Sequence, residues 1–187
     1  LAKERNFDDA LKIIDKAKLL APDFYECLRV EAWINALMGN VSQAYDSYER
    51  AIETEPKAAN ARFMFGGFLL REVDDPERAA EQMQQVIKLM PNAPEPKLEY
   101  ARCCLYLSRF DEAQAILEEL AELPDCHERV HTKILDLQIQ THCRRADFYQ
   151  ANQEPTKAIE SLVALKSYFE SVRSPDQKMY ERLARIR

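Results

Sequence analysis

Two histidines four residues apart flank a glutamate in the segment His127-Glu128-x-x-His131. On a helix this H-E-x-x-H spacing places both imidazoles on one face, where they bind zinc while the glutamate acts as general base. A zinc hydrolase also needs a third ligand and a cleft, yet Ile134 and Leu137 stand where an extended motif of this kind carries Gly and His. Zinc hydrolase is therefore a remote alternative, and we expect no catalytic residue, no bound metal and no cofactor.

The cysteines offer a second kind of chemistry. Cys126 beside the two histidines could hold an incidental transition metal, because cysteine and histidine are suitable ligands at that separation. The chain has five cysteines, an odd number that includes the neighbours Cys103 and Cys104. This count favours free thiols in a reducing compartment, so we expect a cytoplasmic protein. The sequence shows neither a Gly-rich phosphate loop nor a nucleophile elbow.

An alanine recurs along the chain at nearly constant spacing. Four occurrences follow one another at the same interval to within one position, and a fifth comes after a longer step: Ala10, Ala44, Ala79, Ala113 and Ala158. Further core-type residues, mostly apolar, follow each alanine four and seven positions later, and a proline closes each of the first four units. This period predicts a stack of repeated units that bury their apolar faces only against their neighbours.

The pattern resembles the tetratricopeptide repeat, in which a first helix with W-x2-L-G-x2-Y precedes a second helix with A-x3-F and a closing proline. The segment GNVSQAYDSYERAIETEP, from Gly39 to Pro56, carries the resemblance most closely. A second small residue lies 12 or 13 positions before each later alanine, at Ala32, Gly66, Ala101 and Ala146. The resemblance implies an all-α fold, a right-handed solenoid of antiparallel helix pairs with about five repeats.

Small residues are required where the two helices of a pair cross, because bulkier side chains would push the axes beyond about 8–10 Å. Turn residues and prolines then bound the helices. We expect second helices at 8–20, 41–53, 76–89, 110–122 and 156–172, with first helices between them. Only three glycines and no alternating β-branched runs are present, so strands have no support. We expect one domain over 1–187, with repeats at 1–24, 25–58, 59–93, 94–125 and 126–173 and the start of another at 174–187.

The last full unit exceeds the period by about three helical turns, yet neither glycine nor proline interrupts 126–154. Apolar or small residues follow one stripe through this segment at Leu135, Ile139, Cys143, Ala146 and Tyr149. The stripe predicts one unusually long first helix of roughly 35 Å, and not an inserted loop.

Both ends read as truncated. Residues 1–7 have the pattern of the tail of a first helix that runs into a turn before Phe7, and 177–187 predicts a helix without a partner. We therefore expect a fragment of a longer protein whose exposed apolar faces make it self-associate.

The net charge and the hydropathy pattern argue against nucleic-acid binding and against a membrane-spanning segment. The net charge is −6, so the clustered Lys and Arg that bind nucleic acid are not expected overall. No apolar run is long enough to cross a bilayer, so a membrane-spanning segment is not expected. A basic tail after residue 126 could favour an acidic partner, although such charges more often form a solvated helix face.

In the tetratricopeptide family the first helices line a groove that binds peptides or helices. The resemblance assigns this role to ten residues: Arg29, Val30, Trp33, Phe63, Met64, Gly67, Leu70, Leu98, Arg102 and Tyr106. Aromatic and arginine side chains often dominate binding energy. Packing of Trp33 and Phe63 within the solenoid is the competing interpretation.

The leading hypothesis is a non-enzymatic scaffold that binds a partner peptide or amphipathic helix in this groove. The groove is too apolar for the subfamily that clamps a chaperone carboxylate with Lys, Arg and Asn. The alternative is a sensor or regulatory arm of a larger multidomain protein, such as a signalling ATPase, in which the solenoid contacts its own chain.

Overall fold

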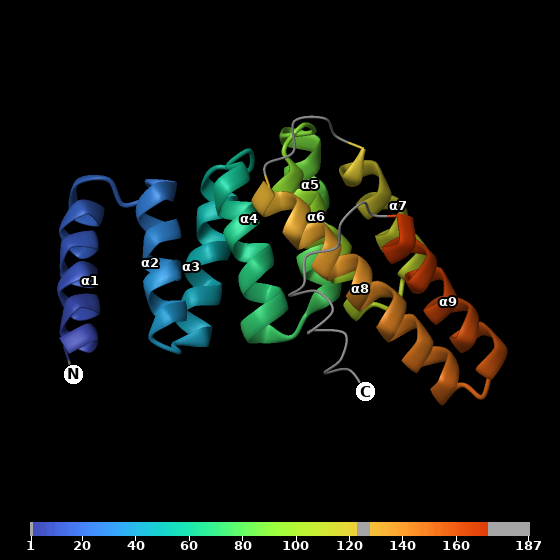
Figure 1. The fold of residues 1–187 in the computed structure, drawn as a ribbon. Helices are drawn as coiled ribbons and strands as arrows, with labels where there is room; N and C mark the ends of the chain where they lie inside the picture. The colour runs from blue at the N-terminus through green and yellow to red at the C-terminus, as the bar shows by residue number, and fades with distance from the viewer. Residues whose placement is uncertain (1, 123–127, 172–187) are drawn as a thin grey trace. The chain divides into compact units, whose positions relative to one another are not determined.

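The computed structural model describes residues 2–122 and 128–171, and over these ranges it contains helices and no strand (Figure 1). The helices are, in chain order, α1 (Ala2–Leu20), α2 (Tyr25–Leu37), α3 (Val41–Thr54), α4 (Ala59–Phe68) with the π-helix η1 (Leu69–Val73), α5 (Pro76–Leu89), α6 (Pro94–Tyr106), α7 (Phe110–Ala121), α8 (Glu128–Ala151) and α9 (Pro155–Ser171). The all-α prediction is confirmed. Backbone contacts divide the chain into two compact units, 1–107 and 108–187, which are described separately.

In the first unit, consecutive helices pack as pairs, α2 with α3 and α4 with α5, while α1 packs against α2 and α6 against α5. The recurrent small residues lie where these helices cross, and Ala32, Ala44, Ala79 and Ala101 are fully buried. Larger side chains, such as Tyr48, fill the space one turn away. The repeat spacing in the sequence is thus the spacing of the buried contacts.

The turns that follow the first helices share one backbone conformation. Gly39, Asp74, Ser108 and Gln153 all have positive φ, between 57° and 78°. Each lies five positions before the recurrent alanine of its repeat. A left-handed residue at this position ends one helix and turns the chain into the next. Only the first of the four is a glycine, the residue that adopts this conformation without steric cost.

The π-helix η1 accounts for an irregularity in the spacing. The interval from Gly66 to Ala79 is one position longer than the equivalent interval in the other repeats. The wider turn of Leu69–Val73 takes up the additional residue, and the backbone N–H of Asp75 donates to the carbonyl of Leu69 over 3.0 Å. Both small residues therefore keep their places at the helix crossing.

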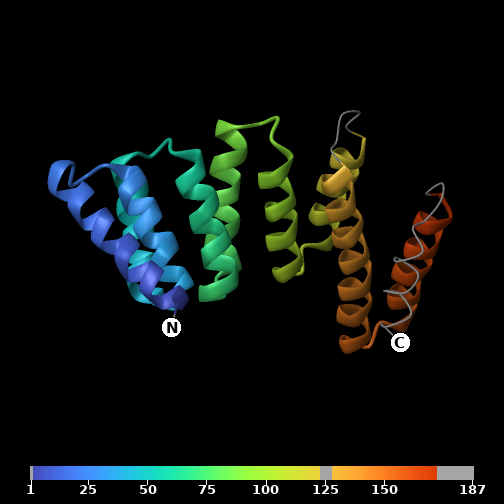
Figure 2. The same cartoon turned by 60° about the vertical axis from the view of Figure 1, so that its left-hand side comes forward.

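The second unit contains α7, α8 and α9, and α8 and α9 form an antiparallel hairpin (Figure 2). Helix α8 is 24 residues long, so the prediction of one elongated first helix is confirmed. Its predicted apolar stripe faces α9, where Ile139 of α8 joins Leu165 and Phe169 in a buried cluster. Leu135 and Cys143 pack against this cluster.

One predicted boundary is wrong. The sequence predicts a turn before Phe7, but α1 runs without interruption from Ala2 to Leu20. Residues 2–9 contain neither glycine nor proline, so no backbone feature stops the helix there. The helix predicted over 177–187 lies outside the described residues. The division into one domain with the stated repeat bounds stays a prediction.

Candidate functional site

The ten residues predicted to bind a partner all belong to the first unit, and we call them the first-helix face. Helix α2 carries Arg29, Val30 and Trp33. Helix α4 and the adjoining η1 carry Phe63, Met64, Gly67 and Leu70, and helix α6 carries Leu98, Arg102 and Tyr106. Within each helix the members are three or four positions apart, or adjacent, so each set occupies one side of its helix. Helices α2 and α4 are direct neighbours.

Polar contacts link α2 to α4 across this face. The Arg29 guanidinium pairs with Glu26 at 2.7 Å and donates from Nη1 to the Met64 sulfur at 3.0 Å. Asn60 of α4 donates to the other carboxylate oxygen of Glu26 at 3.0 Å. The hydrogen bonds from Asn60, from Tyr25 and from Arg29 lower the pKa of the Glu26 carboxyl. Glu26 is therefore held as a carboxylate that joins the two helices.

The aromatic members differ in accessibility. Trp33 is 47% exposed and Tyr106 is 46% exposed, while Phe63 is half-buried. The question of whether Trp33 packs inside the solenoid is thereby resolved, because the neighbouring Ala32 is the buried residue and Trp33 faces solvent. Large rigid rings at the surface are the side chains that bind partners most strongly.

The other members divide between surface and interior. Val30, Met64 and Arg102 are half-buried, and Arg102 pairs with Glu99 at 3.5 Å. Leu70 and Leu98 are only 4% and 2% exposed. Those two leucines pack beneath the face and offer little surface of their own.

Gly67 is buried under the side chain of Arg71. A Cβ atom at this glycine would lie 2.7 Å from Nη2 of Arg71, so the guanidinium rests directly on the helix backbone. Gly67 therefore permits a close approach, and in the described structure the group that approaches is an arginine of the same chain.

A shallow apolar cavity of about 230 Å³ lies beside the face. It opens among α4, the end of α5 and the start of α6, and its lining includes Phe63, Met90 and Pro96. Phe63 is the member of the first-helix face that reaches it. An apolar side chain of a partner would lose water contact on entering this cavity.

The metal hypothesis gains no support from the described residues. Among them, no group of three His, Cys, Asp or Glu side chains is placed to hold an ion. His131 is exposed, whereas Cys126 and His127 lie outside the described residues, as does the side chain of Glu128. Cys103 and Cys104 are buried, and burial raises the pKa of Cys103 to about 12. This thiol is therefore a core group and a poor nucleophile.

Sequence reasoning missed Glu26 and Asn60, although a signal for them exists. Their separation is 34 positions, and Arg29 and Met64 are 35 apart. Residues one repeat apart occupy equivalent places on adjacent first helices. Pairs of complementary side chains at this separation are therefore candidates for contact between repeats.

Comparison with known proteins agrees with this geometry. Residues 70–133 match the family model described as tetratricopeptide repeat. No curated protein matches the chain. None of the helices described here is long and apolar enough to span a membrane.

Solved structures with the same fold include YrrB, described as a TPR protein with an unusual peptide-binding site, at 19% identity and TM-score 0.65, covering 92% of this chain and 82% of that one. PilF of Pseudomonas aeruginosa is 15% identical with TM-score 0.63, covering 98% and 92%. A tetratricopeptide repeat protein from Parabacteroides merdae is 13% identical with TM-score 0.63, covering 99% and 79%.

Proposed function

We propose that this chain, whose residues 70–133 match the tetratricopeptide repeat model, is a non-catalytic scaffold that binds an amphipathic helix or peptide of a partner protein on the first-helix face. The observation that carries the proposal is the set of accessible aromatic rings on this face, Trp33, Phe63 and Tyr106, beside an apolar cavity. A partner helix would place one apolar side chain in the cavity and cover the neighbouring rings.

We expect the polar groups at the first-helix face to orient a bound partner more than they increase its affinity. Arg29 and Glu26 are only partly exposed and already satisfy each other, so a partner that covers them leaves no unpaired buried charge. Met64 adds a flexible, polarisable surface that adapts to different side chains. Free thiols among the described cysteines support placement in the cytoplasm.

The test combines Phe63→Ala with Tyr106→Ala. Partner proteins are captured on the immobilised full chain, and their affinities are then measured with each variant. The double substitution should weaken binding by several kcal/mol, on the order of paired hot-spot losses. Helical content should be unchanged.

The matched control is Gln43→Ala with Gln85→Ala, two exposed residues on the second helices α3 and α5. This control should bind like the original chain. The proposal would be wrong if partners bound the Phe63→Ala, Tyr106→Ala variant normally but failed to bind the control variant. That result would show that the second helices form the binding surface.

A further inference from the structure

The second unit contains an open cavity of about 470 Å³ lined by its three helices. The lining includes Gln114 and Glu118 of α7 with Glu122 directly after its end, Gln138 and His142 of α8, and Tyr168 of α9. Cavities of this size commonly hold small molecules or inserted side chains. This site is distinct from the first-helix face and its assignment does not depend on the proposed function.

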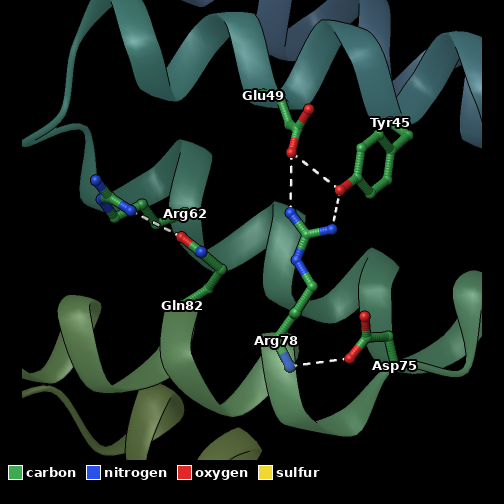
Figure 3. A network of polar contacts seen from close by, with 6 residues as sticks. All are labelled: Tyr45, Glu49, Arg62, Asp75, Arg78 and Gln82. Atoms are coloured by element: carbon green, nitrogen blue, oxygen red, sulfur yellow. Dashed lines mark hydrogen bonds and ion pairs between the residues drawn. The ribbon is translucent and has the colours of Figure 1, made fainter.

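In the first unit an arginine bridges the corresponding two second helices at the equivalents of Gln114 and Glu118. Arg78 of α5 reaches α3, where its guanidinium hydrogen-bonds to Tyr45 and pairs with Glu49 at 2.9 Å (Figure 3). It also lies over the Tyr45 ring, 5.1 Å from the centroid. The space between these two second helices is thus bridged by a cation that belongs to the chain.

In the second unit the same repeat positions lack that cation. Counted from the recurrent alanines, Gln114 and Glu118 of α7 correspond to Tyr45 and Glu49, and Lys157 of α9 corresponds to Arg78. Lys157 instead pairs with Glu154 and lies over the Tyr149 ring, 5.3 Å from its centroid. The second unit therefore keeps the acidic residue, Glu118, but Lys157 pairs with Glu154 and not with it.

An arginine of α8 that contacts two lining residues already pairs with other groups of the chain. Arg145 of α8 donates to Gln114 at 3.1 Å and contacts His142 at 3.1 Å, and it pairs with Asp111 at 3.3 Å. Glu118 accepts a hydrogen bond from the Gln114 amide at 2.8 Å. Within the described part of the chain, neither Glu118 nor Glu122 forms an ion pair with a cation.

The lining of the cavity offers several hydrogen-bond acceptors. Glu118 lies on α7, a helix with four acidic residues and no basic one, and Glu122 follows directly after the end of that helix, one turn further on. Gln138 is 5% exposed, and its Oε1 atom is buried without a hydrogen-bond partner. His142 offers no free donor, because its ring contacts Arg145 on one side and the Ser161 backbone on the other.

We propose that this cavity binds the guanidinium group of an arginine side chain presented by a partner protein. A guanidinium has five N–H donors and no acceptor, which matches a lining of carboxylates and an unpaired amide oxygen. Its flat surface also stacks on an aromatic ring, and Tyr168 supplies one. The partner's arginine thereby does between α7 and α9 what Arg78 does between α3 and α5.

The probe is a capped pentapeptide, acetyl-Gly-Gly-Arg-Gly-Gly-amide, titrated into the isotope-labelled full chain while amide chemical shifts are recorded. Matched peptides carry citrulline, which has the same shape without the charge, or lysine. The arginine peptide should shift the resonances of residues around the cavity, including Gln138 and Tyr168. The citrulline peptide should not, and the lysine peptide should bind more weakly.

Two variants locate the site. Glu118→Gln with Glu122→Gln should weaken binding by about tenfold, while Glu112→Gln with Glu119→Gln, which removes two carboxylates of α7 that lie away from the cavity, should not. Ala164→Leu places a larger side chain in the lining and should abolish binding without lowering the unfolding temperature.

Equal shifts with the citrulline peptide would overturn the assignment to a cation, and equal affinity for the lysine peptide would overturn the assignment to a guanidinium. If both double substitutions weakened binding equally, or if binding survived Ala164→Leu, the peptide would be attracted diffusely to an acidic helix. The assignment of the binding site to the cavity would then be wrong.

Discussion

The guanidinium of Arg29 donates a hydrogen bond to the sulfur of Met64 over 3.0 Å, although the two residues are 35 positions apart in the chain. The Arg29–Glu26–Asn60 contacts repeat the connection one turn away. Two adjacent first helices are therefore joined on the side where a partner is proposed to bind. A change on either helix would affect the geometry of both.

Gly66 should tolerate only one additional carbon. A Cβ there would lie 2.7 Å from the terminal methyl of Met83, a flexible group that can move, and alanine occupies the equivalent position in the other repeats. We expect Gly66→Ala to change the free energy of unfolding by less than about 1 kcal/mol, since a better helix former offsets the crowding. Gly66→Val should destabilise by about 1–3 kcal/mol through overpacking. Urea denaturation of the two variants checks this, and equal stabilities would contradict it.

The Arg78 bridge between α3 and α5 should contribute modestly to stability. Its ion pair with Glu49 is 43% and 42% exposed, so solvent screens the attraction. A double-mutant cycle of Arg78→Ala and Glu49→Ala should give a coupling energy of about 0.2–1 kcal/mol. The same cycle at high salt should give less. A coupling that is insensitive to salt would mean that packing against Tyr45 dominates.

Buried His142 should make stability depend on pH. Burial, and after it the charge of Arg145, lowers the pKa of this histidine below its ordinary 6.5, against weaker opposing effects of the Ser161 backbone and Glu118. Because the unfolded chain then binds the proton more readily, the stabilising contribution is complete above pH 6.5 and decreases as the pH falls toward the folded-state pKa. Denaturation midpoints measured from pH 8 to pH 5 should show this decrease.

Two substitutions separate His142 from the other titrating groups. His142→Gln should flatten the dependence between pH 5 and pH 7, at some cost in stability from the loss of a buried polar contact. His131→Gln, at an exposed position of the same helix, is the matched control. A decrease that persists in the His142 variant would assign it to other groups.

Exposed apolar residues on α1 should cause self-association. Ile13 is 67% exposed and Leu20 is 90% exposed, seven positions apart on the same side of the helix. Sedimentation velocity should show a concentration-dependent increase in mean mass, which Ile13→Lys with Leu20→Lys should reduce. Lys16→Ala, on the same helix, serves as the control. A strict monomer at high concentration would contradict the prediction.

The sequence predicts the helix pairs well because their causes are local. The expected second helices 41–53 and 76–89 differ from Val41–Thr54 and Pro76–Leu89 by at most one residue. The small crossing residues, the turns and Pro76 set those limits without reference to distant parts of the chain. The accessibility of Trp33 follows in turn from the burial of Ala32.

The cavity in the second unit could not be predicted in the same way. Lys157, which holds the repeat position of Arg78, pairs with Glu154 on its own side and is not among the residues that line the cavity. A side-chain direction of this kind is set by competition between nearby partners, and repeat spacing contains no information on it. Repeat position likewise does not reveal that Leu70 and Leu98 are the buried members of the first-helix face.

The π-helix η1 (Leu69–Val73) affects how the length of a repeat can change during evolution. A single additional residue is absorbed within one helix end, so the units on either side keep their alignment. Removing one residue from this segment should restore the shorter spacing without disturbing the neighbours. Repeats of this kind can therefore drift in length by one position, and an alignment that enforces a fixed repeat length would misplace every equivalent position from Leu69 to Ala79.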